Sequence, residues 1–510
     1  MTVTAPPETP TRPIAHKGLK LGAIGLLSSV VFGVASTAPG YSLAATMGLV
    51  ADEVGTRGPI IMLLAFVPML FISYAYQALN NVDPDCGTSF TWVARVFSRR
   101  LGWVTGWVIV IADIIVMANL AQIAGQYTFS LLGLTGLAGS TTAVTALGCA
   151  WILGMTWISW RGVELSARTQ VVLLGLELVV LAVFSAVALA KVYAGTAGGL
   201  AIHPSLDWFN PFGGGMDVKA LSAAFLLAVF IYWGWDSAVA VNEETENMHV
   251  TPGRAAVLST VVLLATYVVV TVAAQAYAGV GADGIGMTNP ATIDDPLSGI
   301  GEAVLGGWGA KFLFLAVLSS AAASTQTTIL PTARTTLSMA AYRAAPKVFG
   351  DVHPRYQTPT VSTWAMGFAS VVFYAGLTLV SPGSLNDLIL SIGLLIAFYY
   401  GLTGFASAWH FRNEPGRTAK DLWLKVIMPL LGGVILLAAF VKTAIDSFAP
   451  ASSETHPFGV GGVFVLGIGS ILLGVVLMIA WNAARPEYFH GTTMRDGVAV
   501  GERGELIALD

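Results

Sequence analysis

Long apolar runs dominate this chain and constrain its fold more than any other feature. A helix needs about 20 apolar residues to cross the hydrocarbon core of a bilayer. Because a lipid-exposed backbone must satisfy its own hydrogen bonds, each such run is expected to be a helix. The sequence therefore predicts an all-α integral membrane protein with twelve transmembrane helices. The runs cover residues 21–50, 58–79, 101–131, 140–159, 168–194, 218–242, 254–281, 308–330, 360–381, 385–409, 423–445 and 458–482.

The composition supports a membrane protein and argues against other classes. Of the 510 residues, 55% are hydrophobic and only 11% are charged, whereas soluble domains carry about 25% charged residues. The net charge of −4, with no basic tract, gives no indication of nucleic-acid binding. Cys86 and Cys149 are too few for a disulfide framework and too far apart for a zinc motif. No nucleophile elbow, phosphate loop or haem motif is present, so we expect neither enzymatic activity nor a cofactor.

The ends of the chain differ from its apolar centre. Residues 1–20 are polar and rich in Pro and Thr, and they are expected to be a disordered tail rather than a cleaved signal. Residues 21–482 are expected to form one membrane domain, because no gap between the apolar runs is long enough for a soluble domain. Residues 483–510 are expected to be a second tail.

The positive charges predict the orientation. With the N-terminus inside, the segments on that side hold 20 of the 25 Lys and Arg residues, and the outer segments hold 5. Because Lys and Arg accumulate on the cytoplasmic side, both termini are predicted to be cytoplasmic. The protein is expected in the cytoplasmic (plasma) membrane as a multi-pass chain.

Two of the runs contain helix-breaking residues. The first carries Pro39 and Gly40 after an earlier Gly33, and the sixth carries Gly234 within Tyr-Trp-Gly-Trp-Asp-Ser. Proline removes a backbone donor, and glycine tolerates non-helical angles. Taken singly, each residue is explained by packing or a kink. Breaks at corresponding positions in two five-helix halves instead indicate an inverted-repeat transporter with a binding site near the midplane.

Four further stretches resemble one known family. Along the chain they are residues 88–107, residues 161–170, Gly234-Trp235-Asp236 with Glu243-Glu244-Thr245 and Pro252-Gly253-Arg254-Ala255, and residues 333–359. In this order, they resemble the amino acid–polyamine–organocation (APC) permeases over essentially the whole chain. The resemblance implies a LeuT-type fold, with inverted repeats at about 21–194 and 218–409 and two extra helices in 423–482. It also implies a permease that works by alternating access.

Asp236 is the first candidate site residue. A carboxylate at bilayer depth is costly and usually marks a substrate or ion path. It could hold an ammonium group, take a proton, or only cap the following half-helix. Phe230, Trp233 and Trp235 precede it and could offer a face to a cation, although packing explains most aromatic residues in membrane helices. By resemblance, Phe230 lies where related permeases place an aromatic residue that stacks on the substrate.

The first break is the second part of the predicted site, formed by Ala35, Ser36, Thr37 and Gly40. Amino-acid permeases of the resembled family have Gly-Ser-Gly here, and its bare amides bind the substrate carboxylate. This chain has Gly33-Val34-Ala35 instead, which weakens such a cradle. The predicted substrate is therefore an amino acid or a small organic amine, with a polyamine as the alternative.

The coupling ion has two candidate sites. Many proton-coupled members of the resembled family carry a Lys in the fifth span, but this chain has no Lys between Arg168 and Lys191 and has Glu177 deep in that run instead. The resemblance therefore does not imply the lysine mechanism, and a proton could use Glu177 or Asp236. The alternative is that Glu177 is a protonated glutamic acid that only forms hydrogen bonds between helices. Ala321, Ser324 and Thr325 resemble a sodium site made of a carbonyl and paired hydroxyls, although small-residue packing explains the same residues. Asp113, with Asn119 and Gln122, is expected to join helices rather than bind a ligand.

The combined prediction is a secondary active transporter for an amino acid or amine, coupled to a proton or sodium by symport. Alternatives are an amine-specific importer or exchanger and, from a different class, a cation channel. The expected partners are the substrate and the lipid bilayer, with the protein a monomer or homodimer.

Overall fold

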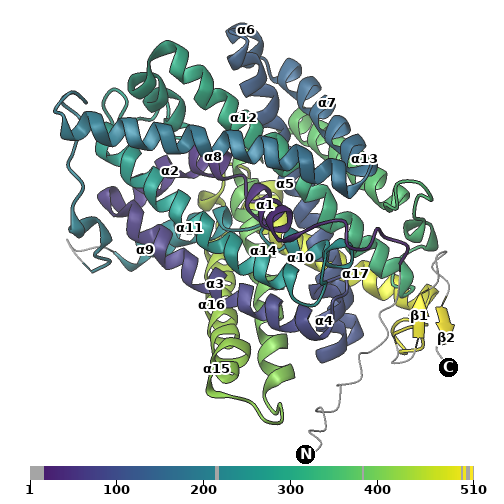
Figure 1. Ribbon diagram of the computed structural model, residues 1–510. Coiled ribbons are helices and arrows are strands. Elements are labelled where there is room, and N and C mark those ends of the chain that lie inside the picture. The colour runs from purple at the N-terminus through teal and green to yellow at the C-terminus, as the bar shows by residue number, and fades with distance from the viewer. Residues whose placement is uncertain (1–16, 213–216, 382–383, 495–497, 501–505, 509–510) are drawn as a thin grey trace, which may run out of the picture.

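The computed structural model describes residues 17–212, 217–381, 384–494, 498–500 and 506–508, and these residues fold mainly into helices (Figure 1). The elements of the first half are α1 (Leu26–Ser36), α2 (Pro39–Val54), α3 (Gly58–Val82), α4 (Ser89–Val96), α5 (Arg99–Leu131), α6 (Thr135–Ala138), α7 (Thr141–Trp160) and α8 (Val163–Tyr193). Those of the second half are α9 (Val218–Ile231), α10 (Ser237–Ala240), α11 (Thr251–Ala278), α12 (Pro296–Ala341), α13 (Thr360–Val380) and α14 (Ser384–Phe411). The last helices are α15 (Ala419–Asp421), α16 (Met428–Asp446) and α17 (Gly462–Ala484).

Among the described residues, ten helical stretches are long and apolar enough to cross a membrane. Nine of them contain one long helix each, and the tenth, Leu26–Val82, holds α1, α2 and α3 together. The sixth predicted run is shorter as a helix than expected, because α9 ends at Ile231 instead of continuing to 242. The predicted count of twelve spans thus stays a prediction, whereas the helical membrane fold is confirmed.

The all-α prediction needs one addition near the C-terminus. Strands β1 (Val498–Val500) and β2 (Leu506–Ala508) pair in antiparallel register, outside the apolar runs. Residues 1–16 of the predicted N-terminal tail lie outside the described residues, but Lys17 and Leu19 are buried. The last part of that tail therefore belongs to the folded domain.

The longest helices, α5, α8 and α12, pack side by side. α12 packs against both α5 and α8, and α8 also contacts α1 and α11 (Figure 1). Gly306 has non-helical angles within α12, and Pro331 lies further along the same helix. This arrangement places α8 and α12 beside the break between α1 and α2, and α12 also contacts α10 at the second break.

Candidate functional site

The break in the first run is short and lies at Thr37 and Ala38. α1 ends at Ser36, Ala38 adopts a left-handed conformation with φ 46°, and α2 starts at Pro39. Proline suits the first turn of a helix because its missing N–H would have no helical partner there. The break thus falls at the predicted Pro39, whereas Gly33 and Ala35 stay inside α1.

The break in the sixth run covers residues 232–236, between α9 and α10. Gly234 has φ 116°, and a Cβ atom there would lie 2.8 Å from the carbonyl carbon and oxygen of Ser36. Only glycine combines this conformation with such a close approach. Ser237 donates a hydrogen bond to the carbonyl of Phe32 at 3.1 Å. The two breaks therefore pack directly against each other.

The carboxylate of Asp236 faces α14. It accepts hydrogen bonds from Tyr400 at 2.9 Å and Tyr399 at 3.1 Å. Asp236 occupies the position before α10, but its side chain makes no hydrogen bond to the start of that helix. The helix-cap alternative therefore does not describe its contacts. Trp233 donates its indole N–H to the Tyr399 hydroxyl, which connects a second predicted residue to the same group.

The predicted aromatic residues fall into two groups. Trp235 is fully buried, and its ring lies 5.1 Å from the rings of both Tyr76 and Tyr400. It therefore packs against Tyr400, which donates a hydrogen bond to Asp236. Phe230 and Trp233 are also buried but keep exposed fractions of 5% and 8%.

The sequence-based prediction missed Tyr76, Tyr399 and Tyr400. The available signal was the pair Tyr399-Tyr400 within an apolar run, because a buried tyrosine hydroxyl usually finds a polar partner. Only the fold brings that pair to Asp236, more than 160 positions away.

Glu177 belongs to α8, and its side chain contacts the beginning of α2. Its Oε1 atom accepts hydrogen bonds from the Gly40 amide at 2.6 Å and from the Ser320 hydroxyl at 2.8 Å. A helix N-terminus favours negative charge. The Oε2 atom is buried and has no hydrogen-bond partner among the described residues. Glu177 therefore connects α8 and α12 to the first break through one carboxylate oxygen, while the other oxygen accepts no hydrogen bond from the described residues.

The residues of the possible sodium site lie along α12. Ser324 donates to the Ser36 carbonyl at 2.7 Å, and Thr325 donates to the Ala321 carbonyl at 2.7 Å. Ser324 thus touches the first break, while the Thr325 hydroxyl is bonded within its own helix. Asp113 accepts from Thr332 at 2.5 Å, which joins α5 to α12 as expected.

The backbone amides at the first break have partners inside the protein. Thr37 N–H donates to Val34, and Ala38 N–H donates to Ala35, at 3.2 and 3.1 Å. Pro39 has no N–H, Gly40 donates to Glu177, and Tyr41 donates to the Ser320 hydroxyl at 3.2 Å. These amides are therefore already used and do not form an open cradle for a carboxylate.

Comparisons with known proteins give a consistent picture. The amino acid permease family matches residues 21–482. A branched-chain amino acid permease, BcaP, of Lactococcus lactis is 23% identical over 446 residues, which cover 83% of this chain and 87% of the relative. The low-affinity putrescine importer PlaP of Escherichia coli is 23% identical over 421 residues, or 82% and 87% of the two chains. An uncharacterized transporter of Mycobacterium tuberculosis is 26% identical over 479 residues, or 93% and 95%.

Proposed function

Because this chain belongs to the amino acid permease family, we propose that it is a secondary active transporter for a small molecule whose amine group is recognised by Asp236. The observation that carries the proposal is the contrast between the two breaks. The first break has its amides occupied by the protein, whereas the second presents a carboxylate whose recorded partners are neutral hydroxyls. A buried carboxylate with neutral partners is suited to a cationic ligand.

The relatives support an amine as the shared element. One is named for branched-chain amino acids and another for putrescine. Both kinds of molecule carry an amine, but only the amino acids carry a carboxylate. The substrate class proposed here is therefore an amino acid or small organic amine, with the amine required and the carboxylate tolerated.

We propose a proton as the coupling ion and Glu177 as its carrier. Glu177 bridges α2, α8 and α12, so the protonation state of its carboxylate affects the contacts among three helices. The buried Oε2 atom has no hydrogen-bond partner among the described residues and could take a proton without breaking a recorded contact. Sodium near Ser324 is the alternative, and its test is replacement of sodium in the transport buffer.

Competition with matched ligands tests the substrate class. Protein reconstituted in liposomes would take up a labelled amine or amino acid in competition with amino acids and their decarboxylated amines. The proposal expects each amine to compete at least as well as its parent acid. If only the acids compete, the carboxylate is the required group and the proposal is wrong. Ohmic conductance in place of saturable uptake would indicate a channel.

A further inference from the structure

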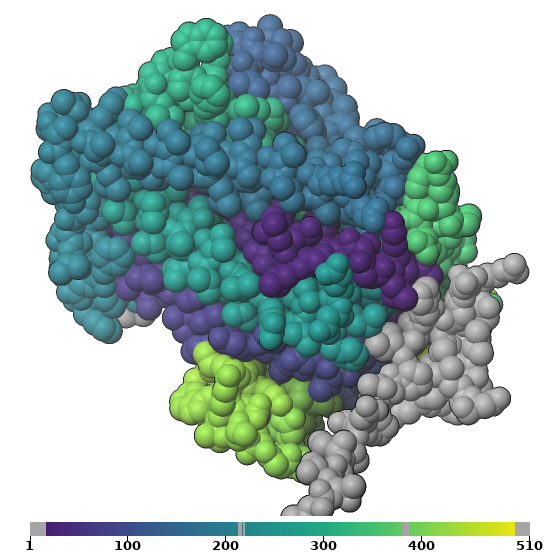
Figure 2. Space-filling model, viewed as in Figure 1, coloured from purple at the N-terminus to yellow at the C-terminus, as the bar shows by residue number. Residues whose placement is uncertain are grey.

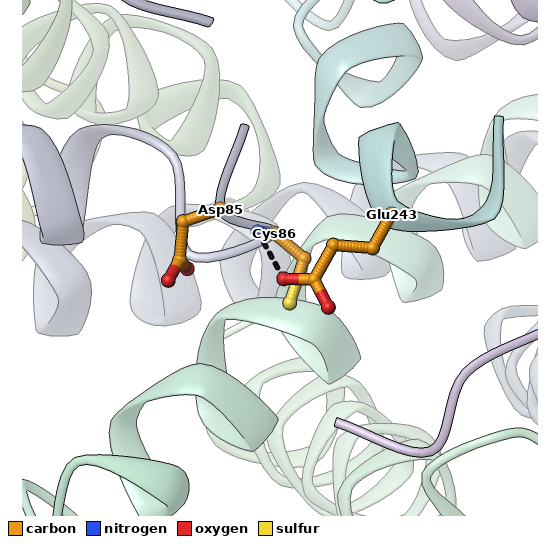
Figure 3. Close-up of side chains that lie close together, drawn as sticks. All are labelled: Asp85, Cys86 and Glu243. Atoms are coloured by element: carbon orange, nitrogen blue, oxygen red, sulfur yellow. Dashed lines mark hydrogen bonds between the residues drawn. The ribbon is translucent and has the colours of Figure 1, made fainter. Parts of the chain in front are cut away.

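Lys17 is buried at one end of the helix bundle between two carboxylates. Its ammonium lies 2.5 Å from Glu243 Oε1 and 3.1 Å from Asp85 Oδ2, and the side chains of all three residues are nearly inaccessible. Cys86 contributes its N–H to Glu243 at 2.9 Å. Figure 3 shows Asp85 and Cys86 on one loop and Glu243 reaching them from the segment opposite. A metal ion could use the same three side chains, but the Lys17 ammonium is already bonded to both carboxylates.

The carboxylates connect Lys17 to separate parts of the fold. Asp85 follows α3 and accepts hydrogen bonds from Ser338 and Tyr342 at the end of α12, both at 2.7 Å. Glu243 follows α10, only seven positions after Asp236. One ammonium thus joins the α3–α4 connection, the end of α12 and the segment that leads directly from the second break.

The backbone after Lys17 continues the same contacts. Ala23 N–H donates to the Glu244 carbonyl, and Glu246 N–H donates to the Ile24 carbonyl, both at 2.8 Å. The Glu244 carboxylate is held by Arg334 in α12 through two hydrogen bonds, at 2.9 and 3.0 Å. We call residues 17–24 the strap. Figure 2 shows the purple start of the described chain at the surface, and α1, which follows the strap, contacts α8 and α11.

The charges of the buried group are retained. Burial lowers the pKa of an ammonium, but Asp85 and the other acidic neighbours outweigh this effect and raise the pKa of Lys17 above its ordinary value. Burial likewise raises the pKa of a carboxyl, yet Lys17 and Arg95 hold the pKa of Asp85 below its ordinary range. Buried ion pairs contribute little net stability relative to apolar packing, and their best attested use is to specify one arrangement over another.

We propose that the strap is a latch on this end of the transport path, and that Lys17 must leave Asp85 and Glu243 before the site opens there. The segment from Asp236 to Glu243 joins the site to the latch, so a movement that exposes the site pulls Glu243 away from Lys17. The purpose of the latch rests on the proposed transport function, but its existence does not depend on the substrate.

Cys86 is a natural reporter for the latch, because it is a buried free thiol beside both carboxylates. In a Cys149→Ala background, Cys86 would be labelled with a maleimide in protein held in lipid nanodiscs, where both faces are accessible. Lys17→Met is expected to raise the labelling rate about tenfold, because labelling of a buried thiol follows the population of the open state. Lys20→Met is the matched control, since the Lys20–Glu164 pair is exposed at 43% and 50% and should contribute little.

A second reporter separates gate opening from local loosening. Ala240→Cys, in a Cys86→Ala, Cys149→Ala background, lies in α10 on the segment between site and latch and is 2% exposed. The proposal expects Lys17→Met to accelerate labelling at this position too. Acceleration at Cys86 alone would mean local loosening and would overturn the latch, as would equal rates in Lys17→Met and the parent.

A double variant covers the case in which Lys17→Met fails to fold. Lys17→Met with Glu243→Gln leaves no unpaired carboxylate at position 243, while Asp85 keeps its hydrogen bonds from Ser338 and Tyr342. It should show the same acceleration at Ala240→Cys, and an unchanged rate would overturn the proposal. Failure of the proposed substrate class would appear in uptake assays and would not alter these rates.

Discussion

At the scale of single residues, Asp236 is the group on which the proposed recognition depends. In the described part of the chain, its carboxylate accepts hydrogen bonds from the hydroxyls of Tyr399 and Tyr400, and neither donor is a cation. A neutral hydroxyl stabilises a carboxylate less than an ammonium does, because a hydrogen bond between two charged groups is stronger than one with a single charge. A substrate amine that binds there would therefore stabilise the charged carboxylate of Asp236.

Replacing Asp236 with Asn tests this role. Asp236→Asn keeps the size of the side chain but removes the charge, so substrate affinity should fall about 10–100-fold, the value of a hydrogen bond to a charged group. Apparent affinity in uptake or thermal-shift assays measures the effect. Asp387→Asn is the matched control, because Asp387 is also buried but accepts hydrogen bonds from the Glu454 amide and the Thr455 hydroxyl in the loop before α17. Full uptake by Asp236→Asn at normal expression would contradict the proposal.

The tyrosine hydroxyls should contribute less than the carboxylate they support. Tyr400→Phe removes one donor at 2.9 Å, at a cost of about 1 kcal/mol, or roughly fivefold in substrate affinity. Tyr374→Phe removes a hydroxyl that donates to Gln122 between α5 and α13, and it should leave affinity unchanged. Equal effects of the two variants would mean that Tyr400 acts only through stability.

Glu177 should control coupling rather than binding. In Glu177→Gln the side-chain oxygen can still accept from Gly40 and Ser320, but the group can no longer exchange a proton. We expect accumulation driven by an imposed pH gradient to be lost, while exchange of substrate across liposomes continues. If accumulation by the wild-type protein depends on a sodium gradient and not on a pH gradient, Glu177 is not the carrier of the coupling ion.

The sequence could identify Asp236 and Glu177 because isolated charges stand out in apolar runs. It could not identify their partners. Tyr400 meets Asp236 across 164 positions, and Glu177 meets Gly40 across 137. Lys17 looked like part of a polar tail for the same reason, because the carboxylates that bury it lie in distant loops.

At the scale of elements, the two breaks are coupled by close backbone contact. Pro39 and Gly234 locate the breaks in the sequence, but the extent of each break depends on its neighbours. Ser324 holds the Ser36 carbonyl at the end of α1, and Glu177 holds the Gly40 amide at the start of α2. Only Thr37 and Ala38 therefore leave the helix at the first break.

Gly234→Ala should separate the two breaks. Its Cβ would lie 2.8 Å from the Ser36 carbonyl, and φ 116° disfavours any side chain, so both strain and a clash oppose the native contact. We expect transport to be lost, with a destabilisation of about 1–3 kcal/mol from backbone strain alone. Gly175→Ala in α8 is the control, because nothing lies within 4 Å of its added Cβ. Normal transport by Gly234→Ala would show that the close contact is dispensable.

At the scale of the whole molecule, hydropathy predicts a helical membrane fold but not the number of crossings. The breaks shorten α9 and divide the first run into α1 and α2, so apolar length alone becomes ambiguous in those parts. The described ends of the main domain nevertheless meet. Lys17 lies 5.7 Å from the Tyr342 ring centroid, and Thr493 donates to the Tyr342 carbonyl at 2.6 Å. Both ends thus lie on one face, as an even number of crossings requires.

The distribution of Lys and Arg predicts that this face is cytoplasmic, and cysteine accessibility in cells would test it. Phe458→Cys lies between α16 and α17 at a side chain that is 96% exposed, and Val348→Cys lies between α12 and α13 at one that is 48% exposed. In a Cys149→Ala background, an impermeant maleimide should label position 458 in intact cells. Position 348 should react only after the membrane is permeabilised, because it lies near the strap: Val352 packs against the cluster of buried residues that contains Leu19. The reverse pattern would place the latch, and both ends of the domain, on the outer face.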